Sequence, residues 1–150
     1  MKLNRILIRK GYATIKLKKI NTNHFELTAI LNGVKGRFIL DTGASNSCID
    51  LGLAEKFKLQ VEDSDTKAAG AGAIGMETKI SSQNHIQIKD WKYQNFNVVL
   101  FDLTHVNTAL TEHNAKPVDG IIGADILEKG KAIIDYSSKC LYLKKLVYKF

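Results

Sequence analysis

The residues best suited to chemistry follow an apolar stretch in the first third of the chain, where the run FILDTGAS occupies residues 38–45. Asp41 comes directly after the apolar residues, and Gly43 permits a tight turn two positions later. A carboxylate at this position projects from the end of an apolar strand, where few water molecules surround it. The spacing predicts a general acid or base at Asp41, although an aspartate can also do no more than cap a turn.

A second run of glycines, at residues 70–75, matches the GxGxxG pattern of dinucleotide-binding turns. Such a turn follows a buried strand and opens a helix. Here residues 62–67 are polar and residues 76–88 have no helical stripe, which argues against a bound nucleotide. The pattern favours the tip of a flexible hairpin, made of Gly70, Ala71, Gly72, Ala73, Ile74 and Gly75.

The four histidines and two cysteines lack the spacing of a metal site or a disulfide framework. We therefore expect no metal and no cofactor, histidines that are exposed or structural, and thiols that are buried and free. These residues are His24, His85, His105, His113, Cys48 and Cys140.

The net charge of +7 is concentrated at the two ends of the chain. Residues 1–20 hold seven Lys or Arg and no acid, residues 136–150 hold four Lys, and the remainder has eleven basic and fifteen acidic residues. This distribution predicts solvated, lysine-rich ends and no nucleic-acid partner. An RNA-associated module that uses the basic termini is the alternative.

The length of 150 residues and the 45% hydrophobic content predict one globular domain over 1–150, with residues 1–20 as a basic strand or extension. The longest apolar run, Val98 to Phe101, is too short to cross a bilayer. No apolar stretch of signal-peptide type follows the basic start. We expect a cytoplasmic protein without a membrane partner.

Short alternating segments separated by turns predict an all-β barrel or sandwich. Asn32-Gly33 is the favoured dipeptide of a type I′ turn and should join two strands as a hairpin. Residues 51–57 and 125–129 have helical spacing, and residues 104–116 suggest a loop or a short helix. The expected strands occupy residues 12–17, 25–31, 34–40, 86–88, 93–101, 120–123, 132–136 and 141–143.

Two motifs in this order resemble the retropepsin-like aspartic proteases, a family with a single DTG per domain. FILDTGASNSCI, at residues 38–49, resembles the active-site loop of the family, and DGIIGADIL, at residues 119–127, resembles its later glycine element and helix. The glycine-rich stretch at 68–78 lies between them, where the family has a flap hairpin. The resemblance covers roughly residues 25–145 and implies a closed acid-protease barrel with a flap and one or two short helices.

The resemblance assigns a role to each matching residue. Asp41 would be the catalytic carboxylate, Thr42 would tie two catalytic loops together, and Gly43 would let the backbone approach. Ser45, next to Ala44, would bond to a carboxylate oxygen. The hairpin at 70–75 would bind substrate, and a structural floor would be formed by Ile121, Ile122 and Gly123.

One position departs from the retroviral pattern. Ala124 stands where retroviral members usually have an arginine, so the interface ion pair of that arginine is missing. Asp125 is then expected to cap its own helix.

The implied activity is that of an aspartic endopeptidase, in which water is activated between two carboxylates. The chain offers one such motif, because Asp119-Gly120 lacks the threonine and Asp135 has no glycine turn. A symmetric homodimer would supply the second Asp41, and a peptide or protein would be the substrate. The alternative is a catalytically silent dimer that binds peptides or mediates protein assembly.

Overall fold

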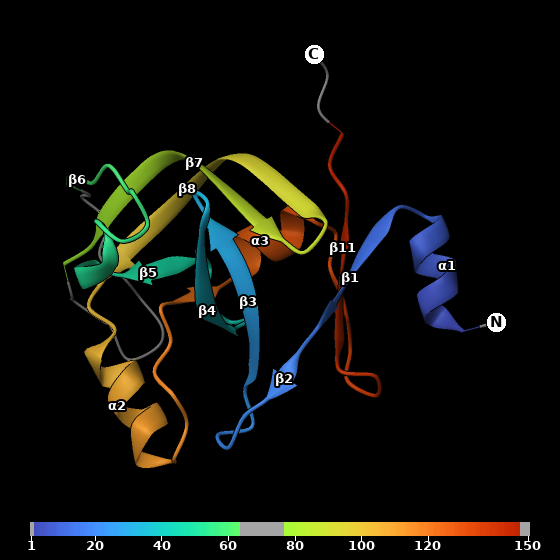
Figure 1. Ribbon diagram of the computed structural model, residues 1–150, viewed down its shortest axis with the longest axis horizontal. Helices are drawn as coiled ribbons and strands as arrows, with labels where there is room; N and C mark the ends of the chain where they lie inside the picture. The colour runs from blue at the N-terminus through green and yellow to red at the C-terminus, as the bar shows by residue number, and fades with distance from the viewer. Residues whose placement is uncertain (1, 64–76, 148–150) are drawn as a thin grey trace.

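The structure, a computed structural model, describes residues 2–63 and 77–147 and consists mainly of strands (Figure 1). The helices are α1 (Leu3–Arg9), α2 (Thr104–Glu112), α3 (Ala124–Lys129) and a 3-10 helix, η1 (Leu51–Leu53). No helix in these two stretches is long and apolar enough to cross a membrane. The strands are β1 (Tyr12–Lys16), β2 (Lys18–Lys19), β3 (Phe25–Leu31), β4 (Val34–Leu40), β5 (Cys48–Asp50), β6 (Glu62–Asp63), β7 (Lys79–Ile88), β8 (Trp91–Phe101), β9 (Gly120–Ile122), β10 (Ile133–Asp135) and β11 (Cys140–Lys144).

The strands β3, β4, β9, β5, β8 and β7 pair in that order, and β7 pairs again with β3. The last pairing joins Ile30 to Gln87 and Leu31 to Ile86, so the sheet closes on itself. Closure leaves no open edge within the ring, which removes a site for unwanted strand pairing. The predicted all-β closed barrel with a few short helices is confirmed.

The hairpin β3–β4 has the turn that the sequence predicts. Asn32 and Gly33 both have positive φ, at 50° and 82°, as a type I′ turn requires. Residues of β3 alternate between buried and more exposed positions, because one face of the strand lines the barrel.

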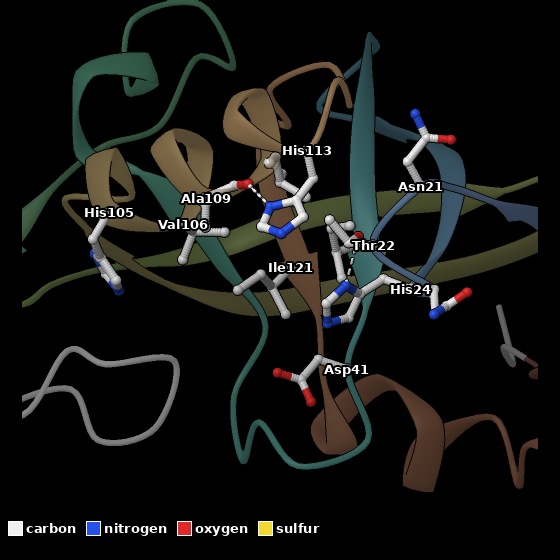
Figure 2. A pocket seen from close by; sticks show the side chains of 12 residues that line it. Asn21, Thr22, His24, Asp41, His105, Val106, Ala109, His113 and Ile121 are labelled. Atoms are coloured by element: carbon white, nitrogen blue, oxygen red, sulfur yellow. Dashed lines mark hydrogen bonds between the residues drawn. The ribbon is translucent and has the colours of Figure 1, made fainter.

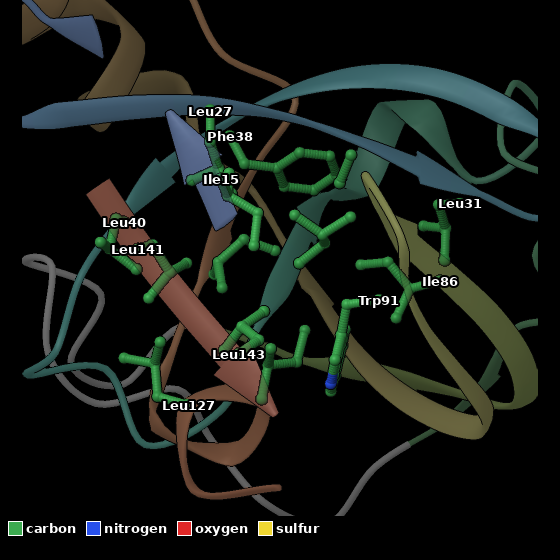
Figure 3. Packing of buried hydrophobic residues seen from close by; sticks show 14 of the residues in the cluster. Ile15, Leu27, Leu31, Phe38, Leu40, Ile86, Trp91, Leu127, Leu141 and Leu143 are labelled. Atoms are coloured by element: carbon green, nitrogen blue, oxygen red, sulfur yellow. The ribbon is translucent and has the colours of Figure 1, made fainter. Parts of the chain in front are cut away.

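A separate sheet, in the order β1-β11-β10, packs against the barrel. Leu141 and Leu143 of β11 join the barrel core, as Figure 3 shows, whereas Cys140 and Tyr142 contact Leu7 of α1 on the opposite face. Since successive residues of a strand face opposite sides, β11 is buried on both faces. Both cysteines are buried and free, as expected.

Two local expectations differ from the structure. Residues 1–20 contain α1 before β1, and this helix buries only Leu7, so no apolar stripe marks it in the sequence. The helix expected at 51–57 is wrong, because only the 3-10 helix η1 forms there. The Asp50 side chain accepts a hydrogen bond from the Gly52 amide at 3.2 Å, and the chain then turns to bury Phe57 against Gly36.

Gly120 provides a test of this packing, because β9 lies between β4 and β5. A methyl group at Gly120 would lie 2.2 Å from the carbonyl oxygen of Cys48, a backbone atom that cannot rotate away. We expect Gly120→Ala to lower the free energy of unfolding by about 1–3 kcal/mol, measured by urea denaturation. Gly52→Ala is the control, since its methyl group would meet only the Asp50 side chain. Equal stability of the two variants would contradict the packing.

Candidate active site

Asp41 follows the last residue of β4. Alternate side chains of β4 and of its neighbour β9 pack into two different apolar clusters. Leu40 and Ile122 face the barrel interior, whereas Ile39 and Ile121 belong to a second apolar cluster on the side of α2. Residues two apart along a strand share a face, so Asp41 emerges on the same side as Ile39. The alternation of β4 therefore directs the carboxylate toward α2.

Backbone hydrogen bonds fix the chain on both sides of the Asp41 carboxylate. The Asp41 amide donates to the carbonyl of Ile122 at 3.0 Å, and the Ala44 amide donates to the Asp41 carbonyl at 3.2 Å. The Gly43 amide donates to Asp41 Oδ1 at 2.9 Å. A Cβ at Gly43 would lie 3.3 Å from the same oxygen, so the backbone approaches the carboxylate closely. The side chain of Asp41 is half-buried and keeps one oxygen for other partners.

The end of β9 supports this loop from below. β4 and β9 run parallel, with Ile39 beside Ile121 and Leu40 beside Ile122. The Ala124 amide donates to the Ala44 carbonyl at 2.7 Å. A Cβ at Gly123 would lie 2.6 Å from that carbonyl oxygen, which leaves no room for a larger residue. The three residues predicted as a floor thus lie beneath the loop.

Ser47 and Asp125 form a connection that the sequence analysis missed. Asp125 Oδ1 accepts hydrogen bonds from Ser47 Oγ at 2.7 Å, from the Ser47 amide at 3.0 Å and from the Ile126 amide at 2.8 Å. Ser47 Oγ in turn accepts from the Gly123 amide at 2.9 Å. Gly123 occupies the N-cap position, so Asp125 does not cap the helix from there. Asp125 still accepts a hydrogen bond from the free Ile126 amide in the first turn of α3, and the same oxygen joins the loop to the helix. In the sequence, nothing distinguishes Ser47 from the neighbouring polar residues.

Other residues predicted for the site have fewer contacts. Thr42 and Ser45 are exposed, and the roles expected of them stay predictions. The residues predicted to form a substrate-binding hairpin lie outside the described residues: Gly70, Ala71, Gly72, Ala73, Ile74 and Gly75.

Asp41 lies at the edge of a cavity of about 600 Å³, between α2 and the turn that precedes β3 (Figure 2). This volume falls within the range of ligand sites, roughly 300–1,000 Å³. The cavity is apolar on its floor and polar at its rim. Its lining consists of Asn21, Thr22, Asn23, His24, Ile39, Asp41, His105, Val106, Ala109, Leu110, His113 and Ile121.

Three of the four histidines share this cavity, although the sequence gave no reason to group them. His24 precedes β3, whereas His105 and His113 lie at the two ends of α2. The closure of the barrel brings these segments together over the Asp41 side of β4. In the described part of the chain, no cluster of His, Cys, Asp or Glu has the arrangement of a metal site.

Among the described residues that line the cavity, Asp41 is the only carboxylate. Asp119 and Asp135, the other aspartates considered as a second catalytic carboxylate, have partners elsewhere. Asp119 accepts a hydrogen bond from the Arg37 amide at 2.9 Å, and Asp135 accepts one from Ser138 Oγ at 2.7 Å. One chain, over its described residues, therefore presents a single carboxylate at this cavity.

Cys48 lies close to this loop but does not offer a nucleophile. Burial raises the pKa of its thiol to about 12, and the nearby Asp125 and Asp41 carboxylates add to the shift. A thiol with such a pKa stays protonated near neutral pH, so it packs as a small apolar group.

The Ser47–Asp125 connection predicts that loop anchoring contributes to stability. Asp125→Ala would leave Ser47 without its carboxylate acceptor, and we expect a loss of about 1–3 kcal/mol in the free energy of unfolding. Asp135→Ala is the matched control, because it removes an aspartate from an exposed turn. Thermal and urea unfolding would measure both, and an equal or larger loss in the control would contradict the anchoring role.

Comparisons with known proteins agree with this geometry. A family model described as aspartyl protease matches residues 27–126. No curated protein sequence matches the chain at a significant level.

Three solved structures have a similar fold. A retropepsin-like aspartic protease from Rickettsia conorii is 20% identical with a TM-score of 0.60, and the match covers 90% of each chain. EIAV protease, in complex with an inhibitor, is 20% identical with a TM-score of 0.53, over 73% of this chain and 90% of the protease. The retroviral protease-like domain of Ddi1 from Leishmania major is 19% identical with a TM-score of 0.54, over 81% of this chain and 88% of the domain. With the family model spanning the Asp41 loop and its floor, the chain belongs to the aspartyl protease family and has the retropepsin-like fold.

Proposed function

We propose that this chain is an aspartic endopeptidase whose active unit is a homodimer, with one Asp41 from each copy. The observation that carries the proposal is a single half-buried carboxylate, fixed by backbone hydrogen bonds, at the edge of a cavity of ligand size. Membership of the aspartyl protease family supports the same assignment. A two-fold axis beside Asp41 would complete the pair.

The chemistry needs one ionised and one protonated carboxyl group. Two carboxylates in contact cannot both ionise without a large cost, so such a pair retains one proton. The ionised Asp41 takes a proton from water, and the water oxygen attacks the carbonyl carbon of the peptide. The protonated Asp41 gives its proton to the carbonyl oxygen. When the intermediate breaks its C–N bond, one carboxyl group gives a proton to the amide nitrogen and the other carboxylate takes a proton from a hydroxyl of the intermediate. An acid and an amine leave, and the pair again holds one proton.

The surrounding contacts suit this role. The Gly43 amide, which donates to Oδ1, fixes the orientation of the carboxylate and leaves the second oxygen for water or the partner carboxyl. Thr42, exposed at the tip of the loop, is available to contact the equivalent loop of a second copy. Rigid placement of this kind reduces the entropy lost on reaching the transition state.

Asp41→Asn tests the catalytic assignment. The amide has the shape of the carboxyl group but cannot exchange the shared proton, so we expect peptide hydrolysis to fall below detection while the fold is retained. Hydrolysis of a mixed peptide library, followed by mass spectrometry, would measure the activity, and circular dichroism would report folding.

Asp90→Asn is the matched control, because it makes the same chemical change at an exposed residue. We expect this control to cleave peptides at the wild-type rate. Wild-type activity in purified Asp41→Asn would refute the proposed chemistry, whereas a peptide that binds equally to both proteins without being cleaved would favour a silent binding dimer.

The homodimer makes a separate prediction about enzyme concentration. Since each copy holds one Asp41, specific activity should fall when the enzyme is diluted below its dimer dissociation constant. An excess of Asp41→Asn subunits should inhibit the wild-type enzyme by forming mixed dimers. Rates measured against concentration, together with analytical ultracentrifugation, test this. Full specific activity from a demonstrated monomer would refute the dimeric site.

A further inference from the structure

The cavity beside Asp41 has two chemically different parts. Its floor is formed by side chains of β4, β9 and α2 that are apolar, whereas imidazole rings project at its rim (Figure 2). The apolar floor residues are Ile39, Ile121, Val106, Ala109 and Leu110. A ligand that fits both parts has an apolar stem and a polar end.

His113, at the C-terminus of α2, is oriented by its own helix. Its Nδ1 lies 2.9 Å from the carbonyl oxygen of Ala109, and a carbonyl only accepts hydrogen bonds, so Nδ1 carries a hydrogen. Within the described residues, Nε2 has no hydrogen-bond partner and remains for a ligand. When the ring is protonated, Nε2 is a charged donor.

His24 is held in a similar way on the opposite wall. Its Nδ1 lies 2.8 Å from Thr22 Oγ1, which leaves Nε2 as the atom without a partner among the described residues. Figure 2 shows the ring of His24 between His113 and Asp41, at the cavity. The two imidazoles and the Asp41 carboxylate thus line the same cavity.

His105 differs, because a carboxylate already lies near it. Hydrogen bonds from Thr104 lower the pKa of Asp102, and the charge of His105 lowers it further. The proposed contact therefore does not involve His105.

A second, smaller pocket of about 170 Å³ continues from the first and shares Asn21 with it. Its lining includes Lys18, Lys19 and Lys116, together with Arg37, which forms an ion pair with Glu26 at 2.7 Å. Glu26 also lines this pocket, so its charged residues are three lysines and one Arg–Glu ion pair. The excess of positive charge in this second pocket favours anions.

We propose that His24 and His113 make this cavity a site for an acidic side chain of the substrate, of glutamate type, close to the cleaved bond. The proposal rests on the proposed protease function and names its substrate class. The methylene groups of the side chain contact the apolar floor, and its carboxylate accepts hydrogen bonds from Nε2 of His24 and His113. The lysines favour further acidic residues in the same peptide.

A contact between an imidazolium and a carboxylate forms at mildly acidic pH, where a carboxyl pair can also retain its shared proton. Isolated imidazole and glutamate side chains are both charged between about pH 4.5 and 6. Among the described residues, the ionisable groups that line the cavity are the three histidines and Asp41, and the adjoining pocket adds Lys18, Lys19, Lys116, Glu26 and Arg37. In a homodimer the two-fold axis places one such cavity on each side of the Asp41 pair, so acidic residues are accepted on both sides of the cleaved bond.

Cleavage profiling tests the proposal. The wild-type enzyme is incubated at about pH 5.5 with a proteome-derived peptide library, and the residues around each cleaved bond are identified by mass spectrometry. We expect acidic residues to be enriched within four positions of the bond. For one cleaved peptide, replacement of that glutamate by glutamine should lower kcat/KM by roughly three- to tenfold.

The same glutamate and glutamine peptides are then compared with variants. In the double variant His24→Gln/His113→Gln, we expect the glutamate preference to disappear. His85→Gln, an exposed histidine of a different pocket, is the matched control and should keep the preference. Equal kcat/KM for the two peptides in the wild-type enzyme, or a preference that survives in the double variant, would overturn the inference.

A binding measurement separates this inference from the proposed chemistry. Fluorescence anisotropy with Asp41→Asn reports recognition without cleavage, using labelled peptides of one fixed sequence that carry glutamate or glutamine at a single position. Tighter binding of the glutamate peptide supports the acidic site even if the wild-type enzyme cleaves nothing, a result that would refute only the protease proposal. Cleavage without a glutamate preference would refute the acidic site but not the protease proposal. Equal binding of the two peptides would also refute the acidic site.

Discussion

The attachment of the Asp41 loop to the end of β9 is the constraint on which the site depends. Hydrogen bonds join Asp41 to Ile122 and Ala44 to Ala124, and the Asp125 carboxylate holds Ser47. A carboxylate on a free loop would sample many orientations, and each reaction would then lose the conformational entropy of ordering it. Here that entropy is lost during folding, because the loop is fixed on both sides of its tip.

The barrel explains why the loop has this attachment. The order of strands places β9 between β4 and β5, the two strands that begin and end the loop. The parallel register of β4 and β9 brings their carboxyl ends to the same edge, so the Asp41 amide reaches the Ile122 carbonyl. Alternation along β4 then directs Asp41 away from the barrel core. The pairing of β4 with β9 thus builds part of the barrel and places the carboxylate.

The sequence predicts what depends on local chemistry. The Asn32-Gly33 turn and the alternation in β3 follow from backbone preference and burial, and both are seen. The sequence could not indicate α1, because one buried leucine leaves no periodic signal. It also could not pair Ser47 with Asp125, 78 residues apart, or bring three histidines into one cavity with Asp41, because these contacts join segments that are distant in the sequence.

The proposed chemistry and the proposed recognition reside on different parts of this fold. The Asp41 loop is packed against β9 so closely that Gly123 has no space for a side chain. Substitutions there disturb the barrel as well as the carboxylate. The helix α2, inserted between β8 and β9, instead buries one residue, Leu110, and presents His113 at its end. A segment with so few buried side chains tolerates change, so the cavity wall can vary its charge while the carboxylate stays in place.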